Sequence, residues 1–135
     1  MTDPRELVRR LVAEAMNGRD LDVLDDLCGD QLAPKLGRAF DQFRTAFPDW
    51  HQEIVELIAG DDGGAVVARF RCTGTHLGDW QGLAATGRSM SVDEVHIFHI
   101  ADGRLAQLWA LEDTWTRMRQ LVGDDATLGD LGSLS

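Results

Sequence analysis

The chain has 135 residues, of which 44% are hydrophobic and 27% are charged, and it contains no tyrosine. This length suits one domain with a core and a ligand cavity, and it is too short for separate cofactor and substrate domains. The 13 Lys and Arg residues face 23 Asp and Glu residues, a formal net charge of −10. That charge argues against binding to nucleic acid or to an anionic membrane.

The cysteines and the apolar segments indicate where the protein works. The first ten residues lack the apolar stretch of a signal peptide, and no run of 18 apolar residues occurs anywhere. We therefore expect a cytoplasmic protein. Cys28 and Cys72 are the only cysteines and no CxxC motif is present, so both are predicted to fill the core rather than to form a disulfide or a zinc site.

Helices are predicted in the first third of the chain. Asp3, Pro4 and Glu6 form a helix start, with an N-cap carboxylate, a proline in the first turn and an acidic residue that completes a capping-box-like arrangement. Apolar residues at helical spacing follow, and Asn17 with Gly18 ends this helix. Asp20 is placed to cap a short second helix. A third helix is predicted over 34–47, where apolar residues recur at steps of four, three and four: Leu36, Phe40, Phe43 and Phe47.

After Pro48 the pattern becomes that of β-strands. Strands are predicted at 51–59, 65–72, 91–100 and from 104 to about 113, followed by a helix at 114–122. Helices first and antiparallel strands second are typical of an α+β fold, with the helices on one face of a curved sheet. We expect residues 1–122 to form this single domain, and residues 123–135, rich in Gly and Asp, to form a flexible tail.

The turn Asp102-Gly103 predicts the register of the last hairpin. These residues suit a two-residue type I′ turn, in which both central residues take positive φ. Because side chains alternate between the two faces of a strand, counting back from the turn places ten residues on one face. The predicted pairs are Ile100 with Leu105, Phe98 with Gln107, His96 with Trp109, Glu94 with Leu111 and Val92 with Asp113.

Four polar side chains stand out on this otherwise apolar face: Glu94, His96, Gln107 and Asp113. A carboxylate or an imidazole in apolar surroundings is costly unless it is paired, and such surroundings tune catalytic pKa values. His99 falls on the opposite face by the same count, so we expect no metal site from His96 and His99.

Each of these residues also has a purely structural interpretation. A histidine on an apolar strand is often a hydrogen-bonded core residue, and Asp113, just before Thr114, is placed to cap the last helix. Trp109 serves equally as a core residue or as a platform for a planar ligand. The alternative for Glu94 is a position at the rim of the pocket, where water solvates its carboxylate. A slip of one residue in register would move the whole set to the other face.

Several motifs resemble those of the SnoaL-like polyketide cyclase family, part of the NTF2-like superfamily. They are FPDW at 47–50, GTHLG at 74–78, ATGRS at 85–89 and IFHIADGRLAQLWALED at 97–113. Together they span roughly residues 7–122 at the spacing of that family. The resemblance implies a cone in which a curved antiparallel sheet packs on N-terminal helices around a deep pocket, in a homodimer or higher homo-oligomer.

The resemblance also implies a chemistry. Cyclases of this family close a ring of a polyketide ester by an intramolecular aldol step, without a metal or an organic cofactor. The acid/base aspartate of the family lies four residues after a strand tryptophan, which corresponds to Asp113 after Trp109. Two departures are visible, because Ala85 stands where the family often has Pro, and Gln107 where it often has Glu.

We therefore expect a hydrophobic small-molecule substrate, with Asp113 and His96 as the catalytic residues. His96 or Gln107 would donate a hydrogen bond to the enolate oxygen. The remaining residues expected to contact the substrate are Trp109, Glu94, Trp80, His76 and His51.

Other functions of the same fold stay open at this point. One is an isomerase of the ketosteroid type, although the oxyanion hole of that enzyme uses a tyrosine and a protonated aspartate, and this chain has no tyrosine. Others are a cofactor-independent hydroxylase-like protein and a binding domain without catalysis. Fold alone does not decide among them.

Overall fold

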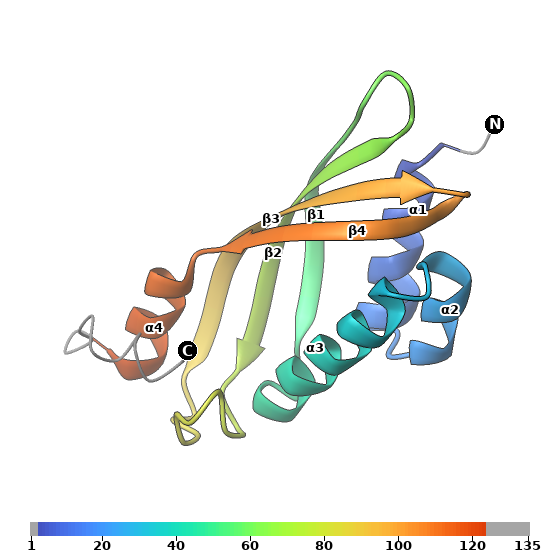
Figure 1. Ribbon diagram of the computed structural model, residues 1–135. Coiled ribbons are helices and arrows are strands. Elements are labelled where there is room, and N and C mark those ends of the chain that lie inside the picture. The colour runs from blue at the N-terminus through green and yellow to red at the C-terminus, as the bar shows by residue number, and fades with distance from the viewer. Residues whose placement is uncertain (1–2, 124–135) are drawn as a thin grey trace.

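A four-stranded antiparallel sheet forms the centre of the molecule. The computed structural model describes residues 3–123, and its strands run in the order β1 (His51–Ala59), β2 (Ala65–Thr75), β3 (Ser89–Ala101) and β4 (Arg104–Glu112). Figure 1 shows β3 and β4 curving over the helices. All four predicted strands are confirmed, and β2 and β3 are longer than the sequence indicated because both extend toward the 76–88 loop.

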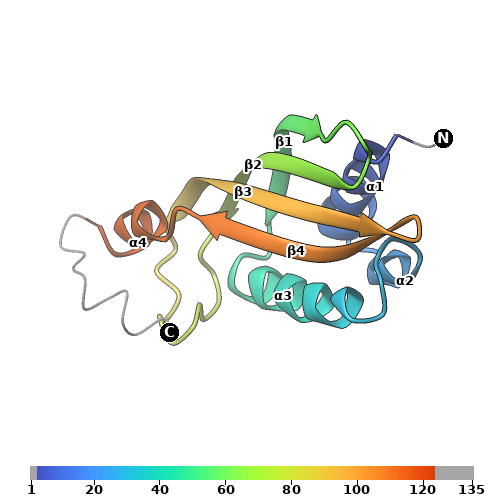
Figure 2. The same cartoon turned by 45° about the horizontal axis from the view of Figure 1, so that its top comes forward.

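The helices cover the concave face of the sheet, as predicted. Helix α1 (Arg5–Arg10) continues as a π-helical segment (Leu11–Asn17), and a 3₁₀ turn (Leu21–Val23) leads into α2 (Leu24–Leu27). Helix α3 (Leu32–Ala46) lies along β4, as Figure 2 shows, and α4 (Thr114–Val122) follows β4.

The predicted helix starts are confirmed in part. The Asp3 carboxylate accepts the backbone N–H of Arg5 at 3.0 Å, and that of Asp20 accepts the N–H of Asp22 at 3.1 Å. The Glu6 side chain does not complete a capping box, because it pairs with Arg9 one turn further along the helix.

The core lies between α1, α2, α3 and the concave face of the sheet. Cys28 and Cys72 are fully buried in it, as expected from the sequence. The other residues with almost no exposed surface include Val8, Leu27, Phe47, Val66, Phe70, Phe98 and Leu105. The predicted flexible tail at 124–135 lies outside the described residues.

The turn between β3 and β4 has the predicted geometry, but the register beyond it is different. Asp102 and Gly103 both have positive φ, at 54° and 73°, and Ile100 pairs with Leu105 as predicted. Ala106 is then an extra residue in β4, so that His99, not Phe98, pairs with Gln107. From this bulge onward the predicted pairs are wrong: Phe98 pairs with Leu108, His96 with Ala110 and Glu94 with Glu112.

The bulge has a tertiary cause. The segment between α2 and α3 runs beside β4 at this point, where Cys28 forms an isolated bridge with Leu105 and Gly29 donates its N–H to the Leu105 carbonyl at 2.8 Å. The Arg104 guanidinium holds the same segment through the carbonyl of Cys28 at 3.3 Å. A bulge accommodates one unpaired residue and bends the strand, and here it lets β4 meet this segment.

The shift of one residue reverses the two faces of β4. Gln107, Trp109 and Asp113, predicted on the inner face, lie outside: the first and last are exposed, and Trp109 is 54% exposed. Leu108 and Glu112 take the inner positions instead.

Helix α4 is attached to the sheet by a buried arginine. Arg117 is 1% exposed, and its guanidinium lies 3.2 Å from a Glu94 carboxylate oxygen and 2.9 Å from a Glu112 oxygen. It also stacks over the rings of Phe43 and Trp80, at 5.6 and 5.4 Å from their centroids. Two carboxylates and two aromatic faces therefore hold one cation.

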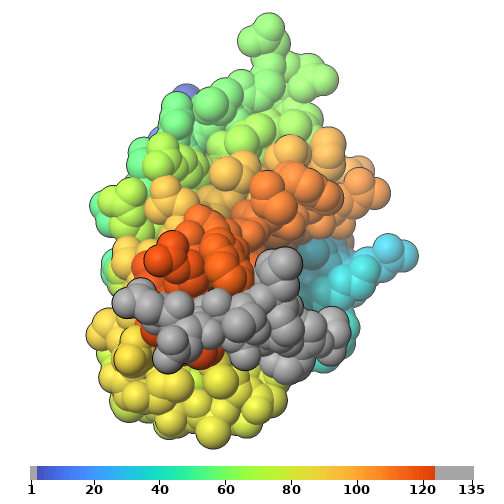
Figure 3. Space-filling view, turned by 90° about the vertical axis from the view of Figure 1, so that its left-hand side faces the viewer, coloured from blue at the N-terminus to red at the C-terminus, as the bar shows by residue number. Residues whose placement is uncertain are grey.

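The loop at 76–88 closes the same end of the molecule, beside α4 (Figure 3). His76 holds it, because its Nδ1 accepts the backbone N–H of Thr86 at 3.2 Å. Gly78 packs against the end of α3, where its N–H bonds to the carbonyl of Ala46 at 3.1 Å. A Cβ at this position would overlap the carbonyl oxygen of Thr45.

We predict opposite effects of adding a methyl group at two glycines. Gly78→Ala should lower the free energy of unfolding by about 1–3 kcal/mol, because the loop must move off α3. Gly37→Ala lies inside α3, where a Cβ would make only an ordinary contact with Leu24 at 3.9 Å. It should raise the free energy of unfolding by roughly 0.5–1 kcal/mol through better helix propensity. Urea denaturation measures both, and an unchanged Gly78→Ala variant would contradict the close approach.

A second prediction concerns the buried cation. Arg117→Met should destabilise the fold by about 3–5 kcal/mol, because Glu94 and Glu112 then lack their counter-charge. Arg119→Met is the matched control on the exposed side of the same helix, with an expected change within about 0.5 kcal/mol. Equal effects of the two substitutions in thermal and chemical denaturation would rule out this role of Arg117.

Candidate active site

A cavity of about 280 Å³ lies between α3 and the inner face of the sheet. Most of its wall is apolar or aromatic, and the polar side chains come from the strands. The lining residues are Met16, Leu36, Ala39, Phe40, Phe43, Trp50, Gln52, Glu94, His96, Leu108, Ala110 and Glu112. An apolar cleft with a few converging polar groups is the usual form of a small-molecule site.

Glu94 and His96 form a hydrogen-bonded pair in this cavity. They are two residues apart on β3, so both point to the inner face, and the Nε2 of His96 lies 2.9 Å from the Oε1 of Glu94. Because an ionised carboxylate only accepts hydrogen bonds, Nε2 of His96 donates the hydrogen of this bond. A carboxylate that orients an imidazole in this way leaves the other ring nitrogen, Nδ1, as the atom that can take or give a proton.

The Glu94 carboxyl stays ionised despite its burial. Burial is the largest single influence and acts to raise its pKa. The hydrogen bond from His96 and the charges of His96 and Arg117 together outweigh it, so that the pKa of Glu94 lies below the ordinary 4.5. A charged group at this depth is stable only because it has such partners.

Two aromatic rings pack against the His96 imidazole. The Phe70 ring from β2 lies almost perpendicular to the His96 ring, with 4.9 Å between centroids. The ring of Phe98, the next inward residue on β3, lies 5.8 Å from that of His96 between centroids. Packing therefore fixes the orientation of His96 as well as the hydrogen bond does.

Of the eight site residues predicted from the sequence, the structure places two in the cavity. Glu94 and His96 line it, and Glu94 is buried rather than solvated at the rim. The other six do not line this cavity: Asp113, Gln107, Trp109, His51, Trp80 and His76.

These six have other surroundings. Asp113 is the N-cap of α4, where its carboxylate accepts the N–H of Thr116 at 3.0 Å and the Thr116 hydroxyl at 2.7 Å. His51, like Gln107 and Trp109, lies exposed outside the cavity. Trp80 stacks behind Phe43 at 4.9 Å, and buried His76 bonds to Thr86 in the loop.

Sequence reasoning missed three residues: Glu112, Arg117 and Trp50. Glu112 was missed because the predicted register was wrong by one residue, which placed its neighbour Asp113 on the inner face instead. Trp50 stood in the FPDW motif, but nothing local indicated that it faces a cavity. Arg117 is a cation among the apolar positions of α4, a pattern that signals a buried charge only when its partners are known.

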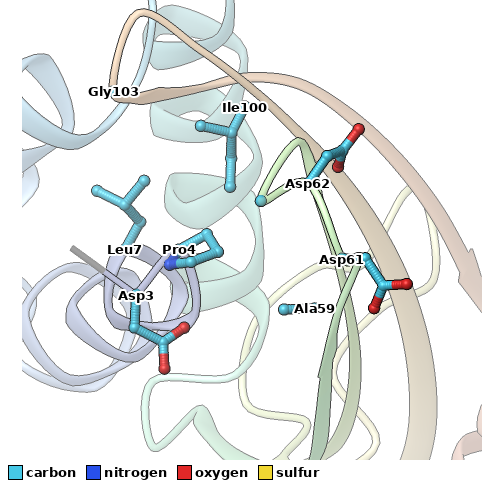
Figure 4. Close-up of a pocket in the computed structure, with 10 residues that line it drawn as sticks. Asp3, Pro4, Leu7, Ala59, Asp61, Asp62, Ile100 and Gly103 are labelled. Atoms are coloured by element: carbon cyan, nitrogen blue, oxygen red, sulfur yellow. The ribbon is translucent and has the colours of Figure 1, made fainter. Parts of the chain in front are cut away.

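A larger cavity, of about 550 Å³, lies at the opposite end between α1 and the two hairpin turns (Figure 4). Its floor is apolar, with Leu7, Pro4 and Ile100. The Asp61 and Asp62 carboxylates point away from that floor (Figure 4), and Asp62 bonds to the N–H of Gly64 at 2.8 Å. This larger cavity contains no hydrogen-bonded acid/base pair, so the cavity lined by Glu94 and His96 is the better candidate for an active site.

Neither a metal cluster nor a membrane-spanning helix occurs in the described part of the chain. Residues 3–123 contain no group of three or more His, Cys, Asp or Glu side chains arranged to hold a metal ion. In the same range every helix is too short or too polar to cross a lipid bilayer.

Comparison with known proteins connects this geometry to a family. The family model of the SnoaL-like polyketide cyclases matches residues 6–121. Two curated relatives are the aklanonic acid methyl ester cyclases DauD of Streptomyces sp. strain C5 and DnrD of Streptomyces peucetius. Each is 26% identical to this chain, and each alignment covers 78% of this chain. The alignments cover 73% of DauD and 81% of DnrD.

Solved structures agree in fold. TsrD from Streptomyces laurentii has a TM-score of 0.80 and 26% identity, over 87% of this chain and 92% of TsrD. A SnoaL-like polyketide cyclase from Agrobacterium tumefaciens has a TM-score of 0.78 at 16% identity, over 90% of this chain and 99% of that one. The α+β cone expected from the sequence is thereby confirmed, and this chain belongs to the SnoaL-like polyketide cyclase family.

Proposed function

We propose that this protein catalyses an intramolecular aldol ring closure of a polyketide-type ester, with His96 as the acid/base residue and Glu94 as its partner. The observation that carries the proposal is the 2.9 Å hydrogen bond between these two side chains in an apolar cavity. The family and the two relatives named as ester cyclases support the reaction class.

The proposed steps need one base that later acts as an acid. Nδ1 of His96 takes a proton from the carbon next to a ketone, and the electron pair moves to the ketone oxygen to give an enolate. The enolate carbon then forms a bond with a second carbonyl carbon of the same molecule. The oxygen of that carbonyl becomes an alkoxide and takes the proton back from His96. The product is an isomer of the substrate, so no other reactant is consumed.

The charges around the pair fit this cycle. Protonated His96 lies beside the ionised Glu94, which stabilises the imidazolium that forms in the first step. Arg117 holds the other Glu94 oxygen at 3.2 Å, so the carboxylate cannot turn away from His96. The apolar wall strengthens each of these interactions because it excludes water.

The role that the family resemblance assigns to Asp113 stays a prediction, and we propose His96 in its place. Asp113 is exposed, and both of its carboxylate oxygens are engaged at the start of α4. The homo-oligomer, the cytoplasmic location and the single-domain boundaries also stay predictions.

Substitutions at three positions test the assignment. His96→Gln should lower kcat by about 10²–10⁴-fold, the usual contribution of a general acid/base residue. Glu94→Gln should lower it less, since the base remains but loses its orienting charge. Asp113→Asn keeps a good N-cap and should leave kcat unchanged. The assay follows conversion of aklanonic acid methyl ester by liquid chromatography.

The pattern of results separates the alternatives. Loss of activity in Asp113→Asn with full activity in His96→Gln would restore Asp113 and overturn our assignment. Oxygen-dependent conversion would indicate a hydroxylase, and a shifted double bond without a new ring an isomerase. Tight binding without turnover in the wild type would favour a binding domain.

The pKa of Glu94 gives a further prediction. Because this pKa is lower in the folded chain than the ordinary 4.5, ionisation of Glu94 stabilises the fold above about pH 4.5, and the gain is lost as the pH falls through the lower folded value. Below about pH 4.5, the unfolding free energy of the wild type should therefore fall more steeply than that of Glu94→Gln. Urea denaturation at several pH values measures both, and parallel curves would contradict the shift.

A further inference from the structure

Trp50 is a buried aromatic residue in the wall of the cavity. It lies between α3 and β1 and is 4% exposed, and its backbone N–H bonds to the Phe47 carbonyl at 2.9 Å. Its ring packs against that of Phe43 at 4.3 Å between centroids, with 30° between the planes. Phe43 and Trp50 both line the cavity, so neighbouring elements fix the position of the indole.

The indole Nε1 of Trp50 is buried and has no hydrogen-bond partner among the residues that the structure describes. An indole N–H is a donor only, and buried tryptophans usually place it on an acceptor. An unmet buried donor costs about 1–3 kcal/mol. Its cost in the free protein is recovered if a ligand in the cavity supplies the acceptor.

The other unpartnered buried atoms of the described residues are explained differently. The Nε2 of His76 is in the 76–88 loop, and His76 does not line the cavity. Arg117 has such atoms too, but its guanidinium lies between Glu94 and Glu112. Trp50 alone in this group combines an unpartnered donor with a place in the cavity wall.

We propose that the Trp50 indole N–H donates a hydrogen bond to a ketone oxygen of a flat, largely apolar ligand. This inference rests on the proposed function, in which that oxygen gains negative charge as the enolate forms. A donor fixed by packing needs no reorganisation when the charge appears. Trp50 thereby selects ligands that carry an acceptor in the ring plane, and hydrocarbons of the same shape leave the N–H unmet.

The size of the cavity suggests the probes. An apolar cavity of about 150 Å³ holds benzene, so about 280 Å³ has room for a probe of two fused rings. 1-Tetralone and tetralin have the same ring skeleton, and only the first has a ketone oxygen. Neither ring closure nor any other reaction is needed to compare them, so the test is independent of turnover.

The experiment is a cycle of two ligands and two proteins, measured by titration with protein-observed NMR. Trp50→Phe keeps the aromatic packing and removes the N–H. We expect the preference for 1-tetralone over tetralin to fall by about tenfold in this variant, which corresponds to one hydrogen bond. Trp80→Phe is the matched control, since Trp80 packs on Phe43 without lining the cavity, and its ligand preference should equal that of the wild type.

A second readout uses the wild-type protein and does not depend on the variant folding. The indole N–H proton of Trp50 should shift downfield when 1-tetralone is added and stay in place with tetralin. Ligand-induced shifts of other cavity residues without a shift at Trp50 overturn the inference. Absence of any binding of 1-tetralone overturns it as well.

The two proposals fail separately. If the Trp50 proton does not respond while His96→Gln still abolishes ring closure, the Trp50 donor is wrong and the cyclase assignment stands. If 1-tetralone binds through Trp50 but aklanonic acid methyl ester gives no cyclised product, the cavity is a ketone site and the cyclase assignment fails.

Discussion

One extra residue in β4 decides which side chains reach the cavity. Ala106 lies where β4 meets the segment around Cys28 and Gly29, whose N–H takes the carbonyl of Leu105. Every residue of β4 after this point faces the side opposite to the one that simple alternation assigns. Glu112 reaches the inner face because of the bulge, and Arg117 on the following helix then has two carboxylates within reach.

The site follows from that arrangement in a short sequence of contacts. Arg117 holds Glu94, Glu94 holds His96, and the aromatic residues Phe43 and Phe70 pack on the two ends of this series. Each group is costly to bury alone, and each is stabilised by its neighbour. The same contacts that attach α4 to the sheet therefore orient the proposed base, so stability and function share residues here.

Much of the fold was predictable from local signals. The change from helical to alternating periodicity after Pro48, and the turn at Asp102-Gly103, gave the element order and the type of turn. His96 and Glu94 were found because they precede the bulge on the uninterrupted strand β3. Gln107, Trp109 and Asp113 were misplaced because the bulge results from a contact with residues about 77 positions earlier, and no local pattern in the hairpin reports such a contact. The role of Trp50 was not predictable for a similar reason. Whether its indole N–H has a hydrogen-bond partner depends on the packing of residues that are distant in the sequence.

The buried arginine also has a consequence for the kind of molecule that enters. Glu94 and Glu112 share the single Arg117 guanidinium beside an apolar wall, at 3.2 and 2.9 Å. A free carboxylic acid would ionise at neutral pH and bring a further anion close to these two carboxylates, where the apolar wall screens charge weakly. A methyl ester has the same carbon skeleton and brings no charge. The two carboxylates therefore disfavour an anionic group in the cavity relative to a neutral group of similar shape.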